Sequence, residues 1–230
     1  MIVRLHNLSA RAPVTSDLRA VIELLIACET DESGMADAVE EEVRNTWQEA
    51  TFNLKTDAWV IVTNKGQIVG YAQVRRDEHE QFIALMRVHP EYRGRGIGTL
   101  LTWLVEERAR YLLNYVSPDT RVTLSSTVSS SDRAACRLFE REGYSEVRSF
   151  WRLIIEMDEM PTESFDDFYQ HGKLKVDLVV DAENLMGTTQ LQRRTGMYVA
   201  HQYVVYEKEL RAARIIEPEE QLEPGLSAYR

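Results

Sequence analysis

The chain has 230 residues, of which 44% are hydrophobic and 28% charged, and its formal net charge is −10. This length suits one generous domain, or one domain and a fragment. The acidic balance argues against general nucleic-acid binding, which needs a concentrated basic surface, and no apolar run approaches the roughly 18–20 residues of a membrane helix.

The N-terminus lacks the basic region and apolar core of a secretory signal, so we expect a cytoplasmic protein without a membrane span. Cys28 and Cys136 fall in stretches that predict helices. In a reducing compartment such cysteines are small core residues more often than disulfide partners. Neither they nor the five histidines have metal-ligand spacing, so no metal site is predicted.

The first part of the chain predicts elements in the order β-α-α-β-β-β. Thr15-Ser16-Asp17 supplies N-cap chemistry for the first helix, and Val39, Val43 and Trp47 recur at the four-residue spacing of the second. Asn64-Lys65-Gly66 is typical of a tight hairpin turn. In chain order, these elements cover residues 1–5, 15–25, 39–47, 58–62, 67–74 and 82–88.

The second part predicts α-β-α-β. Leucines, Ile97 and Val105 recur at helical spacing over 97–113, and Gly143 stands where a helix over 132–141 would end. Strands are predicted over 121–126 and 147–157. An antiparallel meander that feeds a β-α-β unit indicates an α+β fold with a mixed sheet flanked by helices.

After residue 157 the pattern breaks and then restarts. Residues 158–172 are acidic and aromatic without a clear period, which indicates a linker. Residues 175–181 predict a strand, 187–194 a short helix, and 198–210 one or two strands. We therefore divide the chain into a domain over 1–157, a linker over 158–172, a partial unit over 173–212 and a tail over 213–230.

A glycine-rich loop, Arg93-Gly94-Arg95-Gly96-Ile97-Gly98, joins a predicted strand to a predicted helix. The helix N-terminus offers unpaired backbone N–H groups and the positive end of a dipole, and glycines let a phosphate approach closely. Arg93 and Arg95 add positive charge beside this position. Without strand and helix around it, the spacing would be weak evidence for an anion site.

The segment Val88 to Leu101, which contains this loop, resembles the acetyl-CoA motif of the GNAT superfamily. The resemblance implies a GNAT fold, acetyl-CoA (coenzyme A) as cofactor, pyrophosphate binding by the loop amides, and a splayed strand that binds the pantetheine through its backbone. The implied cofactor-binding residues are Met86, Arg87, Val88, Arg93, Gly94, Arg95, Gly96, Ile97, Gly98, Thr99, Asp132, Ala135 and Phe139.

Ala135 to Tyr144 is similar to the second motif of the same superfamily, with one departure. Many members carry there a tyrosine that protonates the departing thiolate, and this chain has Phe139. Tyr144, Ser130 or Ser131 are candidate replacements for that acid. The segments that border the acceptor in the family supply candidate bases, which are Glu29, Asp31, Glu32, His79 and Glu80.

Residues 179–184, Gly187, Leu191, Gly196-Met197 and 206–210 resemble the closing half of another GNAT domain, as in tandem members related to mycothiol synthase. No second glycine loop accompanies them. We interpret 173–212 as a degenerate half-domain that packs on the first domain or on a partner chain. A homodimer is expected because strands such as 199–206 would otherwise expose an edge.

The leading hypothesis is an acetyl-CoA-dependent N-acetyltransferase whose partner is a small-molecule amine or a protein amino group. In this hypothesis the amine attacks the thioester directly, without a covalent enzyme intermediate. The alternative is an acyl-CoA-binding sensor or assembly module with little or no transferase activity. A nucleotide-binding protein of another fold is disfavoured by the meander that precedes the loop.

Overall fold

The computed structural model describes residues 7–34, 39–77, 79–157, 174–182 and 196–212. The strands are β1 Leu8–Arg11, β2 Ala58–Thr63, β3 Ile68–Arg76, β4 Phe82–Val88, β5 Val122–Ser129, β6 Ser145–Met157, β7 Leu174–Asp181 and β8 Tyr198–Arg211. The helices are α1 Leu18–Ser33, α2 Val39–Gln48, α3 Leu54–Asp57, α4 Ile97–Leu112 and α5 Arg133–Arg141, with 3₁₀ turns η1 Thr15–Asp17, η2 Pro90–Tyr92 and η3 Leu113–Tyr115.

The described strands form one sheet in the order β1-β2-β3-β4-β5-β8-β6-β7. Every neighbouring pair is antiparallel except β4 and β5, which run parallel. Their pairing begins at Phe82 with Leu124 and ends at Ala84 with Ser126, although both strands continue for several residues. The two strands therefore part toward their C-terminal ends, as expected from the sequence.

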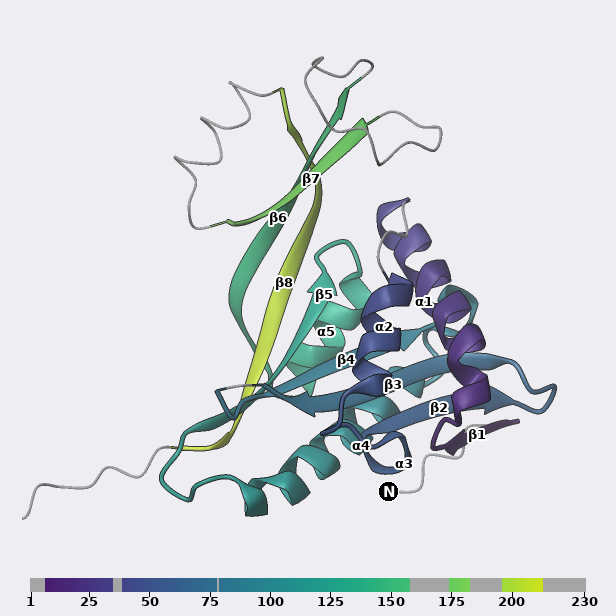
Figure 1. The fold of residues 1–230 in the computed structure, drawn as a ribbon, viewed down its shortest axis with the longest axis vertical. Helices are drawn as coiled ribbons and strands as arrows, with labels where there is room; N and C mark the ends of the chain where they lie inside the picture. Colours follow the sequence, from purple (N-terminus) through teal and green to yellow (C-terminus); the bar gives the residue numbers. More distant parts are fainter. Residues whose placement is uncertain (1–6, 35–38, 78, 158–173, 183–195, 213–230) are drawn as a thin grey trace, which may run out of the picture.

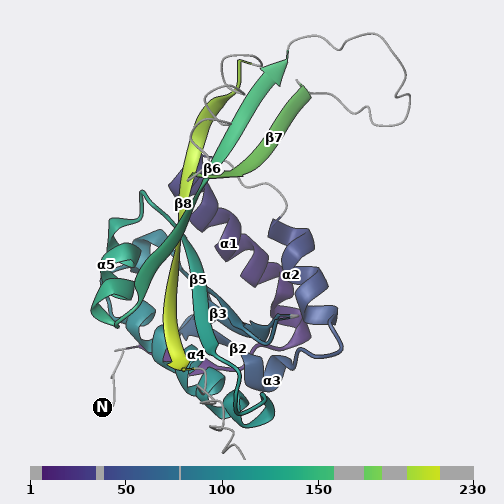
Figure 2. The ribbon, with the colours of Figure 1, turned by 90° about the vertical axis from the view of Figure 1, so that its left-hand side faces the viewer.

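Helices cover both faces of the sheet (Figures 1 and 2). One hydrophobic core packs α4 and α5 on the sheet through residues such as Leu101, Leu124 and Phe139. The other packs α1 and α2 through residues such as Val21 and Val43. Because side chains alternate along a strand, even-numbered residues of β5 point into the core with α4 and α5, and odd-numbered ones point to the opposite side of the sheet, where α1 lies.

Local sequence accounts for the ends of the helices. Gly34 ends α1 in the left-handed conformation with φ 74°, and its N–H donates to the Thr30 carbonyl at 2.9 Å. The Asp132 side chain accepts the Ala135 N–H at 2.9 Å and caps α5. Gly143, with φ 85°, allows the chain to turn from α5 into β6, as the sequence predicts.

The predicted elements are confirmed over most of the chain, and the fold is mixed α/β. The predicted strand over 1–5 lies outside the described residues. The first strand that the structure describes is β1 at Leu8–Arg11. The predicted linker 158–172, helix 187–194 and tail 213–230 also lie outside the described residues. No helix in the described part of the chain has the length and apolar character that crossing a bilayer requires.

The strands of residues 173–212 lie in the same sheet as the first six strands. β8 pairs along β5 on one side and β6 on the other, and β7 adds to the far side of β6. The described part of 173–212 therefore does not build a sheet of its own. Residues 203–206 of β8 pair with both β5 and β6, whereas residues 199–202 pair with β6 alone, so the strand edge from which a dimer was expected is covered over only part of its length. The homodimer stays a prediction.

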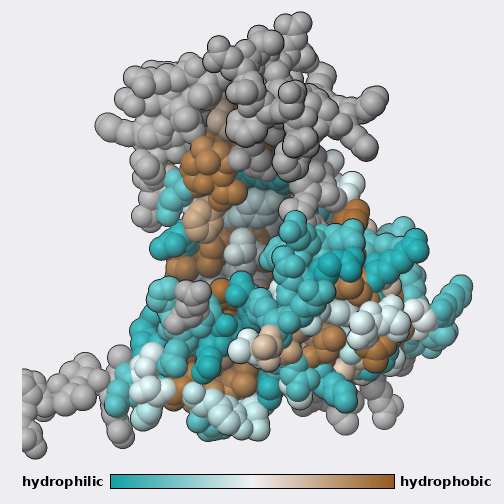
Figure 3. Space-filling model, in the orientation of Figure 1, coloured by the Kyte–Doolittle hydropathy of each residue, from teal (hydrophilic) through white to brown (hydrophobic). Residues whose placement is uncertain are grey.

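Strands β6, β7 and the first part of β8 form an arm that rises from the body beside α1 and α2 (Figures 1 and 2). Hydrophobic side chains are exposed along this arm, whereas the surface over α1 and α2 is mainly hydrophilic (Figure 3). The exposed residues are Val147, Leu178, Val179, Tyr198 and Val199.

A buried ion pair fixes β8 to the body. Lys208 Nζ donates to Glu106 Oε1 of α4 at 2.8 Å and to the Glu142 carbonyl at 2.7 Å, and the Glu106 side chain is 6% exposed. We expect Lys208→Met to lower the free energy of unfolding by about 2 kcal/mol, because a buried carboxylate loses a partner and keeps only Arg110. Lys65→Met in the exposed hairpin turn is the control in urea unfolding, and equal loss in both variants would contradict the assignment.

Candidate functional site

The glycine loop between β4 and α4 has a backbone that requires glycine. Gly94 and Gly96 have φ of 77° and 81°, a left-handed region that favours glycine. Gly96 is also the N-cap of α4. A Cβ on Gly98 would lie 2.8 Å from Leu138 Cδ2, so the missing side chain lets α5 pack against the start of α4.

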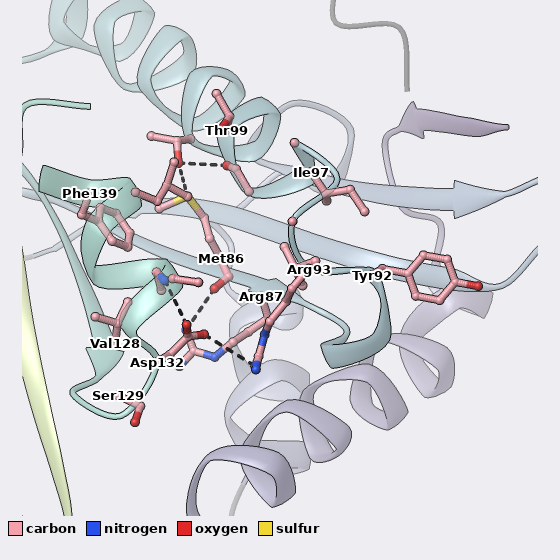
Figure 4. Close-up of a pocket in the computed structure, with 18 of the residues that line it drawn as sticks. Met86, Arg87, Tyr92, Arg93, Ile97, Thr99, Val128, Ser129, Asp132 and Phe139 are labelled. Carbon is pink, nitrogen blue, oxygen red and sulfur yellow. Dashed lines mark hydrogen bonds and ion pairs between the residues drawn. The ribbon is translucent and has the colours of Figure 1, made fainter. Parts of the chain in front are cut away.

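A cavity of about 440 Å³ opens at this loop, between α4, α5 and the parted ends of β4 and β5. Figure 4 shows Met86, Thr99, Val128 and Phe139 around it, with Tyr92 pointing away from the others. Its lining residues are Glu32, Met86, Arg87, Val88, Tyr92, Arg93, Gly94, Gly96, Ile97, Gly98, Thr99, Thr102, Val128, Ser129, Asp132, Ala134, Ala135, Leu138, Phe139 and Arg141.

The phosphate-binding capacity of the cavity comes from the start of α4. The first helical hydrogen bond runs from the Leu100 N–H to the Gly96 carbonyl at 3.1 Å. The N–H groups of the preceding residues, Ile97 to Thr99, therefore have no acceptor within the helix and are available to bind an anion at the positive end of the dipole. Arg141 Nη2 donates to Thr99 Oγ1 at 2.8 Å, which brings a guanidinium to the same rim.

Backbone donors also line the gap between β4 and β5. The His89 N–H donates to the Val69 carbonyl at 3.0 Å, so it points toward β3. Because N–H directions alternate along a strand, the N–H groups of Met86 and Val88 point toward β5, where pairing has ended. These amides are suited to the carbonyl oxygen of a bound thioester and to the charge that develops on it.

Arg93 lies in an acidic environment rather than in open solvent. Its guanidinium contacts Asp31 at 2.6 Å, Glu32 at 3.4 Å and Asp132 at 3.6 Å. Two of these carboxylates come from the end of α1 and the third caps α5. Arg93 thus joins α1, the glycine loop and α5, and its position beside the loop depends on all three.

The carboxylates of α1 lie on the side of the sheet opposite α5. Glu32 lines the cavity, and Glu29 lies one turn earlier on the same face of the helix. Burial raises the pKa of Glu29 to about 6, against the opposing effect of the nearby Arg87 and Arg152 guanidinium groups. Burial also raises the pKa of Glu32. A carboxylate with such a pKa is suited to accept a proton near neutral pH.

Three predicted site residues lie away from the cavity. Glu80 and His79 are in the turn before β4, at the opposite end of that strand from Val88, and Glu80 Oε1 is 4.0 Å from Arg76 Nη1. Tyr144 is buried in the core, with its ring centre 5.0 Å from that of Phe139. Glu80, His79 and Tyr144 do not line the cavity, which disfavours Glu80 as base and Tyr144 as acid. Glu29 does not line it either, but lies one turn from Glu32, which does.

Arg95 also differs from the prediction. Its guanidinium lies over the Tyr92 ring, 4.7 Å from the ring centre, and donates to the Glu91 carbonyl at 3.2 Å. Its side chain is exposed and does not line the cavity. The other twelve predicted cofactor-binding residues all line the cavity.

The sequence analysis missed Ser129, Thr102 and Arg141 among the polar residues that line the cavity. Helical spacing could have found Arg141, because it follows the lining residues Ala134 and Leu138 at four and then three positions on one face of α5. Ser129 had no such signal, since its place depends on where β4 and β5 part. Among the described residues, no group of three or more His, Cys, Asp or Glu side chains is arranged to hold a metal ion.

Comparisons with known proteins agree with this geometry. Residues 55–146 match the acetyltransferase (GNAT) domain family. Over 108 residues the chain is 32% identical to mycothiol acetyltransferase from Saccharopolyspora erythraea, a match that covers 45% of this chain and 35% of that protein. The chain therefore spans about a third of the length of that relative.

Solved structures share the fold. A GCN5-related N-acetyltransferase from Sphaerobacter thermophilus superposes with a TM-score of 0.75 at 23% identity, over 90% of this chain and 97% of that one. A GNAT superfamily phosphinothricin acetyltransferase from Sinorhizobium meliloti, in complex with acetyl-CoA, has a TM-score of 0.54 at 13% identity, over 95% and 97% of the two chains.

Proposed function

We propose that this chain transfers an acetyl group from acetyl-CoA to an amine, because residues 55–146 match the acetyltransferase (GNAT) domain family. The observation that carries the proposal is the cavity, which combines glycines in left-handed conformations, the free N-terminal amides of α4 and a parted pair of strands. The acceptor is a small-molecule amine or a protein amino group.

The residues of the cavity fit acetyl-CoA chemically. The amides of Ile97 to Thr99 and the Arg141 guanidinium suit the phosphates, and the cleft between β4 and β5 suits an extended pantetheine. A Cβ on Gly98 would collide with Leu138, which also lines the cavity, so glycine here keeps α5 close to the start of α4. Bound acetyl-CoA supplies the thioester that is attacked and the thiol that leaves.

The protein residues then perform two tasks. The Met86 and Val88 amides hold the carbonyl oxygen and stabilise the negative charge that develops there. Glu29, half-buried on α1, takes a proton from the incoming ammonium group, so that a neutral nitrogen is present for attack. Direct attack in a ternary complex then needs no covalent enzyme intermediate.

Amine-dependent release of CoA thiol tests the function. The protein is mixed with acetyl-CoA and a panel of small amines, amino acids and peptides, and free thiol is followed over time. We expect at least one class of amine to raise thiol release well above the rate with acetyl-CoA alone. Binding of acetyl-CoA without amine-dependent release from any class would contradict the transferase proposal.

The second candidate function is an acyl-CoA-binding sensor, and the environment of Phe139 favours it. Phe139 is 3% exposed, and its ring stacks on Tyr206 with ring centres 5.4 Å apart. Where many relatives of the superfamily place an acidic hydroxyl, this chain has an apolar side chain packed in the core. Both candidates predict acetyl-CoA binding, and thiol release separates them.

A further inference from the structure

A hydrogen-bonded chain of three side chains runs from the loop before α5 into the sheet. Ser131 Oγ is 2.6 Å from Ser129 Oγ, which in turn is 2.7 Å from His201 Nε2 on β8. The Ser131 N–H also donates to Ser129 Oγ at 3.1 Å. Ser129 and His201 are 1% and 9% exposed, and Ser129 lines the cavity.

The position of Ser129 relates this chain of side chains to the reacting atoms. If the register of β4 and β5 continued beyond Ala84 and Ser126, Ser129 would stand opposite Arg87, between the Met86 and Val88 amides. As an odd-numbered residue of β5, Ser129 faces α1, the side on which Glu29 and Glu32 lie. Figure 4 shows it at the end of β5, below Val128.

The surroundings of His201 favour the neutral form of its imidazole. Burial and the Arg152 guanidinium, its cross-strand partner on β6, both lower the pKa of His201. The Tyr203 ring lies beside the imidazole, with ring centres 4.6 Å apart. A neutral imidazole can take the Ser129 hydroxyl proton at Nε2 while the Ser131 hydroxyl donates to Ser129.

We propose that Ser129 and His201 form a proton relay that removes the second proton from the attacking amine and returns it to the leaving sulfur. The inference rests on the proposed function. It assigns to this pair the acid role for which the superfamily motif often has a tyrosine and this chain has Phe139. Ser129 is the residue that touches the reacting groups, and His201 acts through it.

The proton that leaves the nitrogen is the one that reaches the sulfur, so the step needs no other acid or base. When the nitrogen has bonded to the acetyl carbon, its N–H replaces the Ser131 hydroxyl as the donor to Ser129. The proton passes to Ser129 Oγ as the Ser129 proton passes to His201 Nε2. As the C–S bond breaks, the imidazolium returns its proton through Ser129 to the sulfur, because a thiol, with a pKa of about 8.5, is the weaker acid.

Kinetic variants test the relay. His201→Gln retains a polar partner for Ser129 but cannot carry the proton, and Ser129→Ala removes the link. We expect either change to lower kcat by about 100-fold, the lower end for general acid–base catalysis, while calorimetry shows an acetyl-CoA Kd within about threefold of wild type. Gln202→Ala, at the neighbouring position of β8, is the matched control and should leave kcat unchanged.

Chemical rescue separates proton transfer from packing. We expect imidazole to restore at least part of the kcat lost in His201→Ala. Pyrazole, which has nearly the same shape but is a far weaker base, should not restore it. Equal rescue by both compounds, or wild-type kcat in a folded His201→Gln variant, would overturn the relay while the transferase function stands. If the wild type releases no thiol with any amine, the proposed function fails first.

Nitrogen NMR of the ligand-free protein gives a readout that does not depend on activity. The relay requires Nε2 of His201 to be the unprotonated nitrogen at pH 7. Ser129→Ala would then raise the pKa of His201, because the hydroxyl donates to the neutral ring and stabilises it. A protonated Nε2 in the wild type at pH 7 would overturn the proposal even if every variant failed to fold, and so would a His201 pKa that falls in a folded Ser129→Ala variant.

Discussion

Gly96→Glu is expected to raise the Kd of acetyl-CoA by about 100-fold or more, which corresponds to roughly 2.7 kcal/mol. The new carboxylate would lie at the N-cap of α4, where the amides of Ile97 to Thr99 are free to bind an anion. It would both repel the phosphates and compete for the amides, and hydrogen bonds to charged groups contribute about 1.5–3 kcal/mol each. Isothermal titration calorimetry measures the change.

The control for this variant must reproduce its backbone strain. Gly66, in the turn between β2 and β3, has φ 85°, close to the 81° of Gly96, and a Cβ there would meet nothing within 4 Å. Gly66→Glu therefore adds the same charge and a similar conformational cost away from the cavity. Equal weakening of acetyl-CoA binding in the two variants would contradict the assignment of the loop.

Glu29→Gln is expected to lower kcat by about 100- to 1,000-fold with little effect on acetyl-CoA binding, within the usual contribution of a general base. A raised pKa means that the carboxyl group is protonated, and inactive as a base, at higher pH than usual. In the wild type, kcat should therefore fall as the pH drops below about 6, and Glu29→Gln should lack that dependence.

Glu23→Gln is the matched control for this prediction. Glu23 lies on the same helix but pairs with Arg19 in solvent, where both side chains are more than half exposed. Its substitution should leave kcat and the pH profile unchanged. If Glu29→Gln retained wild-type kcat and Glu32→Gln did not, the base would be the carboxylate that lines the cavity instead.

The glycine loop could be read from the sequence because its chemistry is local. The spacing of Gly94, Gly96 and Gly98 between a strand and a helix fixes the backbone that the structure then shows. The position of Glu80 disfavours it as the base, and the length of the predicted strand already argued against it. β4 has seven residues, so its start lies about 20 Å from the loop that follows its end.

Contacts between distant segments could not be read in the same way. Ser129 meets His201 because β8 lies beside β5, and nothing in the alternation of residues 198–211 indicates which strand is its neighbour. The interpretation of 173–212 as a half-domain meets the same difficulty and stays a prediction. A strand that is paired on both edges and a strand from a second unit have similar local patterns.

The insertion of β8 between β5 and β6 also affects how the chain folds during translation. During synthesis, the inner edges of β5 and β6 have no partner until residues 198–211 have left the ribosome. From the emergence of β6 until residues 198–211 follow, the nascent chain therefore carries two unpaired strand edges, and such edges invite misassembly and recruit chaperones. Ribosome-bound chains that end before residue 198 should be digested by protease, and protection should appear only when β8 is free to enter the sheet.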